Sequence, residues 1–438
     1  MRNAFFLLFF VVAGVAVPAQ DRALTVNDVV VLALENNFDI QVSRNDSSLA
    51  ALDYAFNKYS FFPTLNATGT ASFVNNDQRQ TLADGRNVER DGIRSNNKQA
   101  SLNLQWTLFD GTRMFVTRQR LRSLILLGAA GVKAQVVNSV AETVRLYYDV
   151  VRQQDQQKAI REQIALAGER LKLAQYNFDV GTGTKQDVLQ AQIDANAQQS
   201  LLLTAQAAVD NLKQQLANIT GLALGTAWQP ADSISIAPLL TLDTLQAGIE
   251  QSNPELIQFN QQRTVANLLL RERRAERYPV AVFNAAYNFN RNNNLTVINP
   301  FQPLFNQVRG FNYGFVLNVP LFNNYINRRN IAAAQLNIRF ADIQYQRSRA
   351  IVLTALNTAY RNYLLARETA LLEEGTLRLV RENLFIAQER YRLGVTTFLE
   401  MRTAEQNLAD AQSRLINARF NIKAAEIELM RVRGDLVR

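Results

Sequence analysis

Two carboxylates stand at matching places in the two halves of the chain. Asp187 lies six residues after Gly181, and Glu400 lies six residues after Gly394. A lone carboxylate on a helix is usually solvated, and that interpretation stays open here. If several copies of the chain surround one axis, each acid is repeated around it and forms a ring that attracts cations and restricts anions. The chemistry that these residues indicate is ion selection in a pore.

Other kinds of chemistry are excluded by what the sequence lacks. It contains no Cys and no His, so it offers no thiolate or imidazole for nucleophilic triads, disulfides, or common zinc and haem sites. The segment Gly181-Thr182-Gly183-Thr184-Lys185 resembles a phosphate loop only superficially, because it lacks the required spacing and follows a helix. We interpret it as a helix C-cap and turn that Gly394 repeats. The sequence therefore predicts neither an enzyme nor a bound cofactor or metal.

The N-terminus indicates an exported protein. The 438 residues carry a formal net charge of +9, and 19% of them are charged. Arg2, the apolar stretch 4–17 and the small residues at 17–19 predict a secretory signal peptide. A membrane anchor is the alternative, but it needs a longer apolar run than this one, and no internal run reaches the roughly 20 residues of a spanning helix.

The sequence also repeats itself once. Asn37 matches Asn253, and Gly181 matches Gly394, so the two copies follow each other at a nearly constant offset. Each copy is expected to hold a helix, two strands, a long helix and a final helix. The predicted divisions are a signal peptide over 1–19, a first repeat over 20–238 and a second repeat over 239–438.

Long helices are predicted in both repeats. In the first, apolar residues are spaced alternately by three and four positions, and the second repeat reproduces this spacing at the matching positions. This is the seam of a coiled coil, where apolar side chains meet a partner helix. The proline-free stretch 112–178 alone would span on the order of 100 Å as a helix. The stripe in the first repeat is Ile164, Ala167, Leu171, Ala174 and Phe178.

Between the helices the periodicity changes to two. Four segments alternate apolar with uncharged polar side chains, as Leu102 and Leu104 do with Asn103 and Gln105. Such strands are typical of a transmembrane barrel, although a half-buried soluble sheet gives the same alternation. The predicted strands are 62–75, 99–109, 279–290 and 310–322. The polar segments 75–99 and 290–310 are predicted to be long loops outside the cell.

Four strands are too few to close a barrel. A sheet edge in hydrocarbon leaves N–H and C=O groups unpaired, at a cost of several kcal/mol each. The smallest common barrels have about 8 strands. Copies of the chain are therefore expected to share one barrel, and an open lumen needs at least three of them, because a dimer's barrel would be filled by its own side chains.

Several features together carry a family resemblance. They are the order strand, strand, long helix, helix, given twice, the segment Leu-Glu-Asn-Asn at 34–37, Pro63, Pro279, Pro320, and the turns Phe178-Asp179-Val180-Gly181 and Tyr391-Arg392-Leu393-Gly394. The chain resembles the TolC-like outer-membrane efflux channels over nearly all of its mature length. The resemblance implies a mainly α fold with a membrane β-barrel, in which a homotrimer shares about 12 strands and a periplasmic α-helical barrel. The number three comes from the resemblance alone.

The resemblance also implies roles for the two turns. It places them at a periplasmic tip that forms the gate and the docking site for an adaptor protein. The expected gate residues are Asp187, Tyr391, Glu400, Arg390 and Arg392. The expected adaptor-docking residues are Val180, Gly181, Thr182, Leu393, Gly394 and Val395. Thr396 and Thr403 stand where the family pattern has an arginine and a second acid, so Arg390, Arg392 or Arg402 is expected to substitute.

The chain is thus expected to be an outer-membrane exit duct with a periplasmic extension. Its partners would be an adaptor and an inner-membrane pump of a tripartite efflux or type I secretion machine, together with outer-membrane lipid. The alternative is a structural or adhesive surface protein that uses the barrel as an anchor and the helices as a spacer. Nucleic acid is not an expected partner, because acids interrupt the basic run at 271–274.

Overall fold

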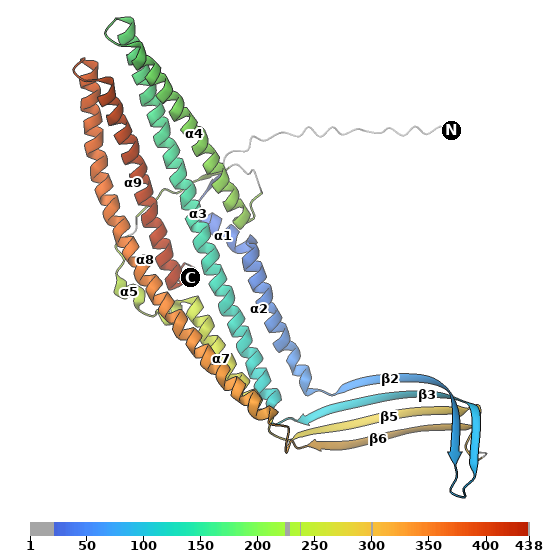
Figure 1. Cartoon of the computed structure of the whole chain (residues 1–438). Helices are drawn as coiled ribbons and strands as arrows, with labels where there is room; N and C mark the ends of the chain where they lie inside the picture. The colour runs from blue at the N-terminus through green and yellow to red at the C-terminus, as the bar shows by residue number, and fades with distance from the viewer. Residues whose placement is uncertain (1–21, 224–227, 237, 299–300, 437–438) are drawn as a thin grey trace, which may run out of the picture. The chain divides into compact units, whose positions relative to one another are not determined.

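The structure is a computed structural model that describes residues 22–223, 228–236, 238–298 and 301–436 (Figure 1). The predicted signal peptide lies outside the described residues. The chain divides into two compact units, and each unit combines segments from both halves of the sequence. Unit 1 takes in the described parts of Met1–Val42, Lys133–Pro254 and Ala350–Arg438. Unit 2 takes in Ser43–Val132 and the described part of Glu255–Arg349.

Four long helices dominate the chain. They are α3 (Arg113–Asp179), α4 (Lys185–Thr220), α8 (Ile326–Arg392) and α9 (Phe398–Arg433). The helices α3 and α8 have 67 residues each, and α4 and α9 have 36 each. The helices α3 and α8 begin the same number of residues apart as α4 and α9 do. The matched glycines Gly181 and Gly394 are separated by this same number. The duplicated helical pattern is thereby confirmed, while the boundary between repeats at 238 and 239 stays a prediction.

Each pair of long helices forms a hairpin with an apolar seam. In the first hairpin, Ala174 of α3 packs with Val188 and Ala191 of α4. In the second, Leu384 of α8 packs with Ala404 and Leu408 of α9. These contacts include positions of the alternating three and four spacing, so burial of the apolar stripe holds each hairpin together.

Shorter elements complete the helical part of the chain. The short parallel pair of β1 (Arg22–Leu24) and β4 (Trp228–Pro230) lies beside Tyr147, whose hydroxyl donates to the Leu24 carbonyl at 2.8 Å. Tyr147 and Trp228 stack with ring centroids 6.3 Å apart. The remaining helices are α1 (Val26–Asn36), α2 (Phe38–Asn57), η1 (Lys58–Phe61), α5 (Leu242–Gln246), α6 (Ile249–Ser252) and α7 (Pro254–Ala275).

Unit 2 holds a four-stranded antiparallel sheet with the order β2-β3-β5-β6. Its strands are β2 (Thr64–Thr81), β3 (Asn87–Phe109), β5 (Val280–Asn294) and β6 (Phe305–Asn318). The pairing of β3 with β5 joins the two halves of the chain. Among the described strands, β2 and β6 each pair on one side only.

The register of the sheet gathers its apolar side chains on one face. Trp106 pairs with Phe283, and Phe283 pairs with Phe315 on the next strand. On the other face Gln105 pairs with Asn284. Every side chain of β6 is exposed in the single chain, including Phe315. An apolar face that the chain leaves uncovered suits contact with lipid, as the alternation in the sequence predicted.

The polar segments between paired strands differ from the prediction. The strand β2 continues past residue 75 to Thr81, and β3 already begins at Asn87, so most of the predicted loop 75–99 is a paired hairpin. The predicted loop 290–310 is likewise shortened, because β5 runs to Asn294 and β6 begins at Phe305. These extensions carry polar residues on both faces, so they lack the alternation of apolar and polar residues from which the strands were predicted. The backbone pairing of the strands nevertheless continues through them.

Among the described residues, one helix has the length and composition of a membrane span. An 18-residue window of α3 has a mean hydropathy of 1.5. Interspersed polar residues break this stretch into short apolar runs, so no single run in it is as long as a membrane span. A helix with apolar residues on more than one face gives the same average, and such a window alone is weak support for a span.

Candidate functional site

The turn between α3 and α4 is closed by backbone hydrogen bonds around Gly181. The Thr182 N–H donates to the Asn177 carbonyl at 2.8 Å, and the Gly181 N–H donates to the Phe178 carbonyl at 3.1 Å. Gly181 has a φ of 79°, which disfavours residues with a Cβ. The pattern is a Schellman motif, so the glycine ends the helix as the sequence predicted.

The turn between α8 and α9 repeats this geometry in the second half of the chain. The Val395 N–H donates to the Arg390 carbonyl at 2.9 Å, and the Gly394 N–H donates to the Tyr391 carbonyl at 3.0 Å. Gly394 has a φ of 73°. The two turns are therefore equivalent in structure as well as in sequence.

Both predicted gate acids lie at the start of the helix that follows the turn. Thr184 and Asp187 form a capping box: the Asp187 N–H donates to the Thr184 hydroxyl oxygen at 3.1 Å, and the Thr184 N–H donates to the Asp187 carboxylate at 3.3 Å. The Thr184 hydroxyl also donates to this carboxylate at 2.7 Å. The Glu400 N–H donates to the Thr397 hydroxyl at 3.3 Å, and the Thr396 hydroxyl donates to the Glu400 carboxylate. Thr184 and Thr397 therefore cap the two helix N-termini, and Asp187 completes a capping box at the first of them. The role of both acids in the gate stays a prediction.

Tyr391 lies where the two hairpins meet. Its ring packs against Phe398 at a centroid distance of 6.3 Å, and its side chain is buried. The pKa of Tyr391 is raised overall, mainly because its side chain is buried. The charge of Asp187 adds to this rise, whereas a hydrogen bond with the Asn177 side chain and the charge of Arg170 oppose it. The structure therefore brings Tyr391 of the second hairpin close to Asp187 and Asn177 of the first.

The arginines divide into exposed and bonded groups. Arg390 and Arg392 are exposed, and among the described residues their side chains make no ion pair. Arg402 forms an ion pair with Asp194. Within the part of the chain that the structure describes, none of the three arginines proposed to substitute at the gate pairs with Asp187.

The predicted docking residues lie on the surface of the two turns. Val180, Leu393 and Val395 are exposed apolar side chains. The exposed residues at the turns are Val180, Gly181, Thr182, Leu393, Gly394 and Val395. An exposed apolar patch suits contact with another protein, so adaptor docking stays a prediction at this surface.

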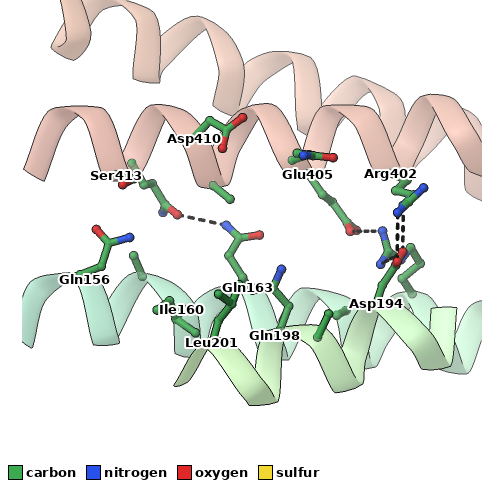
Figure 2. A pocket seen from close by; sticks show the side chains of 17 residues that line it. Gln156, Ile160, Gln163, Asp194, Gln198, Leu201, Arg402, Glu405, Asp410 and Ser413 are labelled. Carbon is green, nitrogen blue, oxygen red and sulfur yellow. Dashed lines mark hydrogen bonds and ion pairs between the residues drawn. The ribbon is translucent and has the colours of Figure 1, made fainter. Parts of the chain in front are cut away.

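A cluster of four charged residues, of which three are largely buried and Arg402 is 38% exposed, was not predicted. We name Arg170, Asp194, Arg402 and Glu405 the ion-pair cluster. Arg170 donates to Asp194 at 2.8 Å and to Glu405 at 2.7 Å, and Arg402 Nε lies 3.0 Å from the Asp194 carboxylate. Figure 2 shows Arg402 of α9 paired with Asp194, and Glu405 of the same helix nearby. The Arg170 and Glu405 side chains are only 5% and 8% exposed.

The pKa of Glu405 is raised overall, because its burial in the ion-pair cluster outweighs the favourable charge of Arg170. The charge of Asp194 adds to this rise. The cluster lines a cavity of about 410 Å³ together with Gln163 and other polar side chains (Figure 2). No group of three or more acids that suits a metal ion occurs among the described residues.

A spacing of seven positions in the sequence could have revealed these groups. Gln163, Arg170 and Asn177 follow one another at this interval on α3, as Glu405 and Gln412 do on α9. A heptad interval keeps residues on one side of a coiled-coil helix. This polar stripe lies one position before the apolar stripe of Ile164, Leu171 and Phe178 along α3.

Comparisons with known proteins agree with this architecture. The family model described as outer membrane efflux protein matches residues 29–222 and 247–435. Outer membrane protein TolC of Vibrio cholerae is 23% identical over 301 residues, which cover 68% of each chain. The probable efflux pump outer membrane protein TtgC of Pseudomonas putida is 24% identical over 424 residues, covering 92% of this chain and 81% of its own.

Solved structures share the fold at low identity. The CmeC outer membrane channel of Campylobacter jejuni aligns with a TM-score of 0.77 at 18% identity, over 94% of this chain and 85% of its own. The open state of the MtrE outer membrane channel of Neisseria gonorrhoeae aligns with a TM-score of 0.74 at 14% identity, over 94% and 90%.

Proposed function

Because this chain belongs to the outer membrane efflux protein family, we propose that three copies of it assemble into the exit duct of a tripartite efflux or type I secretion machine. The chain itself is an outer-membrane efflux channel with a periplasmic helical extension. The proposal concerns how this channel is assembled, gated and coupled to its partners.

The structure of the sheet supports a barrel that several copies of the chain share. It exposes an apolar face and pairs β2 and β6 on one side only among the described strands. Unpaired backbone groups are too costly in hydrocarbon to persist. Pairing β2 of one copy with β6 of the next satisfies both edges, and three copies give about 12 strands around an open lumen.

The two turns support a gate and a docking surface. Exposed apolar residues at both turns, Val180, Leu393 and Val395 among them, suit a periplasmic adaptor. The gate would comprise Asp187, Tyr391 and Glu400, with Arg390 and Arg392 on the exposed side. Transport through the duct is passive in this proposal, and the energy comes from an inner-membrane pump that the adaptor connects.

Planar-bilayer recording tests the channel against the adhesive or structural alternative. The purified protein in detergent should have a mass close to three mature chains and should insert as a cation-selective conductance. A monodisperse monomer contradicts the shared barrel. A trimer that inserts but never conducts, under any voltage or in any gate variant, favours the sealed anchor.

A further inference from the structure

Three basic side chains lie on the apolar face of the sheet, near the strand ends that do not connect to helices. Lys98 of β3 lies four positions from Leu102 in an unbroken register, so both occupy this face. Arg291 of β5 and Arg309 of β6 each lie two positions from an aromatic residue of the same face. We name Lys98, Arg291 and Arg309 the basic patch. All three are exposed, and their strands belong to unit 2.

The register of the sheet brings these like charges together. Lys98 pairs directly with Arg291 across β3 and β5. Arg291 pairs with Gln307 on β6, so Arg309, two positions further, is its diagonal neighbour. Directly paired residues have Cβ atoms about 4.5 to 5.5 Å apart, and like charges at that spacing destabilise a sheet. The basic patch therefore costs stability unless an anion lies beside it.

The acids of the sheet do not supply that anion. The strands β5 and β6 contain no Asp or Glu. On β3, Glu89 already forms an ion pair with Arg79 of β2 at 2.5 Å. Asp77 of β2 accepts from a backbone N–H at 2.7 Å, and Asp91 follows the bulge, seven positions from Lys98. Among the described residues, no member of the basic patch forms an ion pair or a hydrogen bond through its side chain.

The basic patch lies where the apolar face ends. At about 3.4 Å per residue, the ten positions from Ala281 to Arg291 extend about 34 Å along β5. Barrel strands tilt by about 40°, so this length crosses about 26 Å of membrane, close to the roughly 25 Å height of an apolar band. The Arg291 guanidinium also lies over the Phe305 ring, 5.2 Å from its centroid, and aromatic residues are typical of the membrane interface. The patch is thus at the level of lipid head groups.

The chemistry of these side chains suits phosphate. A guanidinium binds phosphate oxygens through two parallel N–H groups, and an ammonium binds them as a point charge. A phosphate between Lys98 and Arg291 would replace their repulsion by two attractive contacts. Because the helical extension is periplasmic, this end of the strands reaches the outer leaflet, where the lipid is a glycolipid that carries phosphate groups.

We propose that the basic patch binds the phosphate groups of an outer-leaflet glycolipid. The acyl chains of that lipid would lie along the apolar rows below the patch, on Phe289 and Phe311, which are part of the same face. The proposal rests on the proposed function, because the patch meets this leaflet only if the strands span the membrane. Each further copy of the chain in the assembly would repeat the site.

Binding of fluorescent diphosphoryl lipid A to the purified protein in a nonionic detergent tests the site. Replacing all three residues of the basic patch by Gln should weaken binding by on the order of a hundredfold, or about fivefold for each cation. A matched control removes three positive charges from exposed positions of α8, with Arg361→Gln, Arg378→Gln and Arg381→Gln. The control should bind as wild type does, and equal affinity in both triple variants overturns the site.

Competing ligands identify what the site recognises. Lipid A without phosphates should bind wild type and the patch variant alike. Phosphatidylglycerol, with a single phosphate, should compete roughly tenfold less well than diphosphoryl lipid A. Equal competition by phosphatidylglycerol would reduce the patch to a general anionic-lipid surface, and full competition by equimolar inorganic phosphate would assign it to free phosphate. Either result overturns the glycolipid.

Stability without lipid separates binding from a structural role. Lys98→Glu places an opposite charge beside Arg291, so it should raise the melting temperature in detergent by on the order of 2 °C. The same change should weaken lipid binding, since it puts a carboxylate where the phosphate would lie. A lower melting temperature with unchanged lipid affinity would give Lys98 a structural role and overturn the site.

The lipid assay is independent of channel activity, because it measures binding in detergent. If lipid A binding depends on the basic patch but no variant conducts in a planar bilayer, the channel proposal fails and the lipid site stands. If the patch variant conducts and also binds lipid A as wild type does, the lipid site fails and the channel proposal stands.

Discussion

At the scale of residues, the predicted gate acids have two roles that substitutions can separate. Asp187 caps α4 with Thr184 and also lies close enough to Tyr391 to raise its pKa. A capping role depends on hydrogen bonds to the backbone, whereas a gating role depends on charge. The hydrogen bonds of the cap and the charge of the acid can be changed independently.

Replacing Asp187 by Ala should destabilise the first turn of α4 and raise channel conductance. Loss of an N-cap residue costs about 0.5 to 2 kcal/mol per helix. Asp187→Ala removes only the N3 side of the capping box and leaves Thr184 as the N-cap, so its cost is expected at the lower end of this range, and a trimer would repeat the change three times. Thr184→Ala is the matched control, because it breaks the same capping box but keeps the carboxylate. Equal conductance in both variants assigns Asp187 to capping. A rise in Asp187→Ala alone assigns its charge to the gate.

Replacing Glu400 by Gln should lower cation selectivity without changing the conductance of the open channel. The amide keeps the size of the side chain while removing one negative charge per copy from the proposed constriction. Asp410→Asn removes the same charge from an exposed position elsewhere on α9 and should leave selectivity unchanged. Reversal potentials in a salt gradient measure both, and identical values for the two variants place Glu400 outside the pore.

Tyr147 should make stability depend on alkaline pH. Burial raises the pKa of Tyr147 to about 12 from 10.0, while the backbone N–H of Asp232 lowers it and the Asp232 carboxylate raises it. The folded chain therefore holds this proton more tightly than the unfolded chain. Its stabilising contribution is complete below pH 10 and is lost as the pH rises toward 12.

The Tyr147→Phe variant measures this contribution. It removes the hydroxyl that donates to the Leu24 carbonyl at 2.8 Å, so it should unfold at lower temperature than wild type near pH 8. The gap between the two melting temperatures should narrow between pH 10 and 12. Tyr176→Phe, at an exposed tyrosine of the same helix, should follow wild type throughout. A constant gap for Tyr147→Phe contradicts the raised pKa.

At the scale of elements, glycines in the long helices have opposite effects according to their conformation. Gly394 ends α8 with a φ of 73°, and no neighbouring atom lies within 4 Å of the place that a Cβ would occupy, so only backbone strain opposes a side chain there. Gly375 lies inside α8 with equally open surroundings and no left-handed φ. The two positions form a matched pair.

Substitution by Ala should therefore change stability in opposite directions. Gly394→Ala should destabilise the turn by about 1 to 2 kcal/mol, because a Cβ disfavours the left-handed region. Gly375→Ala should stabilise the helix by about 0.5 to 1 kcal/mol. Thermal unfolding followed by helical circular dichroism measures both. Destabilisation by Gly375→Ala would indicate that this surface is covered in the assembled protein.

The elements were predictable wherever one face of each differs from the other. The apolar stripes revealed the long helices and their offset, and the alternation around Leu102 and Leu104 revealed the strands. The extension of β2 to Thr81 was missed because polar residues occupy both faces there. Arg170 was missed for a different reason: a buried charge looks like a solvated one until the fold brings its partner Glu405, from the other half of the chain, beside it.

The junctions from strand to helix were also missed. Gly111 and Thr112 have φ values of 73° and 71°, and the matching residues of the second repeat, Asn324 and Tyr325, have 51° and 60°. Of these four, Gly111 and Asn324 are residue types that adopt such a conformation readily, whereas Thr112 and Tyr325 would have argued against it. The duplication preserves the backbone path while the residue types differ.

At the scale of the whole molecule, connectivity determines which ends of the strands share a side of the membrane. The strands β2 and β5 begin after η1 and α7, and β3 and β6 are followed by α3 and α8. The four strand ends that connect to helices therefore lie at the same end of the antiparallel sheet. The β2–β3 turn over 82–86 and the connection from β5 to β6 lie at the opposite end of the strands.

Labelling of intact cells tests the resulting orientation. If the helices occupy the periplasm, the β2–β3 turn must face outside, since a spanning strand reverses sides between its ends. In this cysteine-free chain, Ala83→Cys places one thiol in that turn and Thr182→Cys places one at the α3–α4 turn, and both positions are exposed. A membrane-impermeant maleimide should label Ala83→Cys on intact cells and should reach Thr182→Cys only after the outer membrane is permeabilised. The reverse pattern would invert the barrel, and equal labelling of both on intact cells would remove the strands from the membrane, because only a spanning sheet separates the two turns by a lipid barrier.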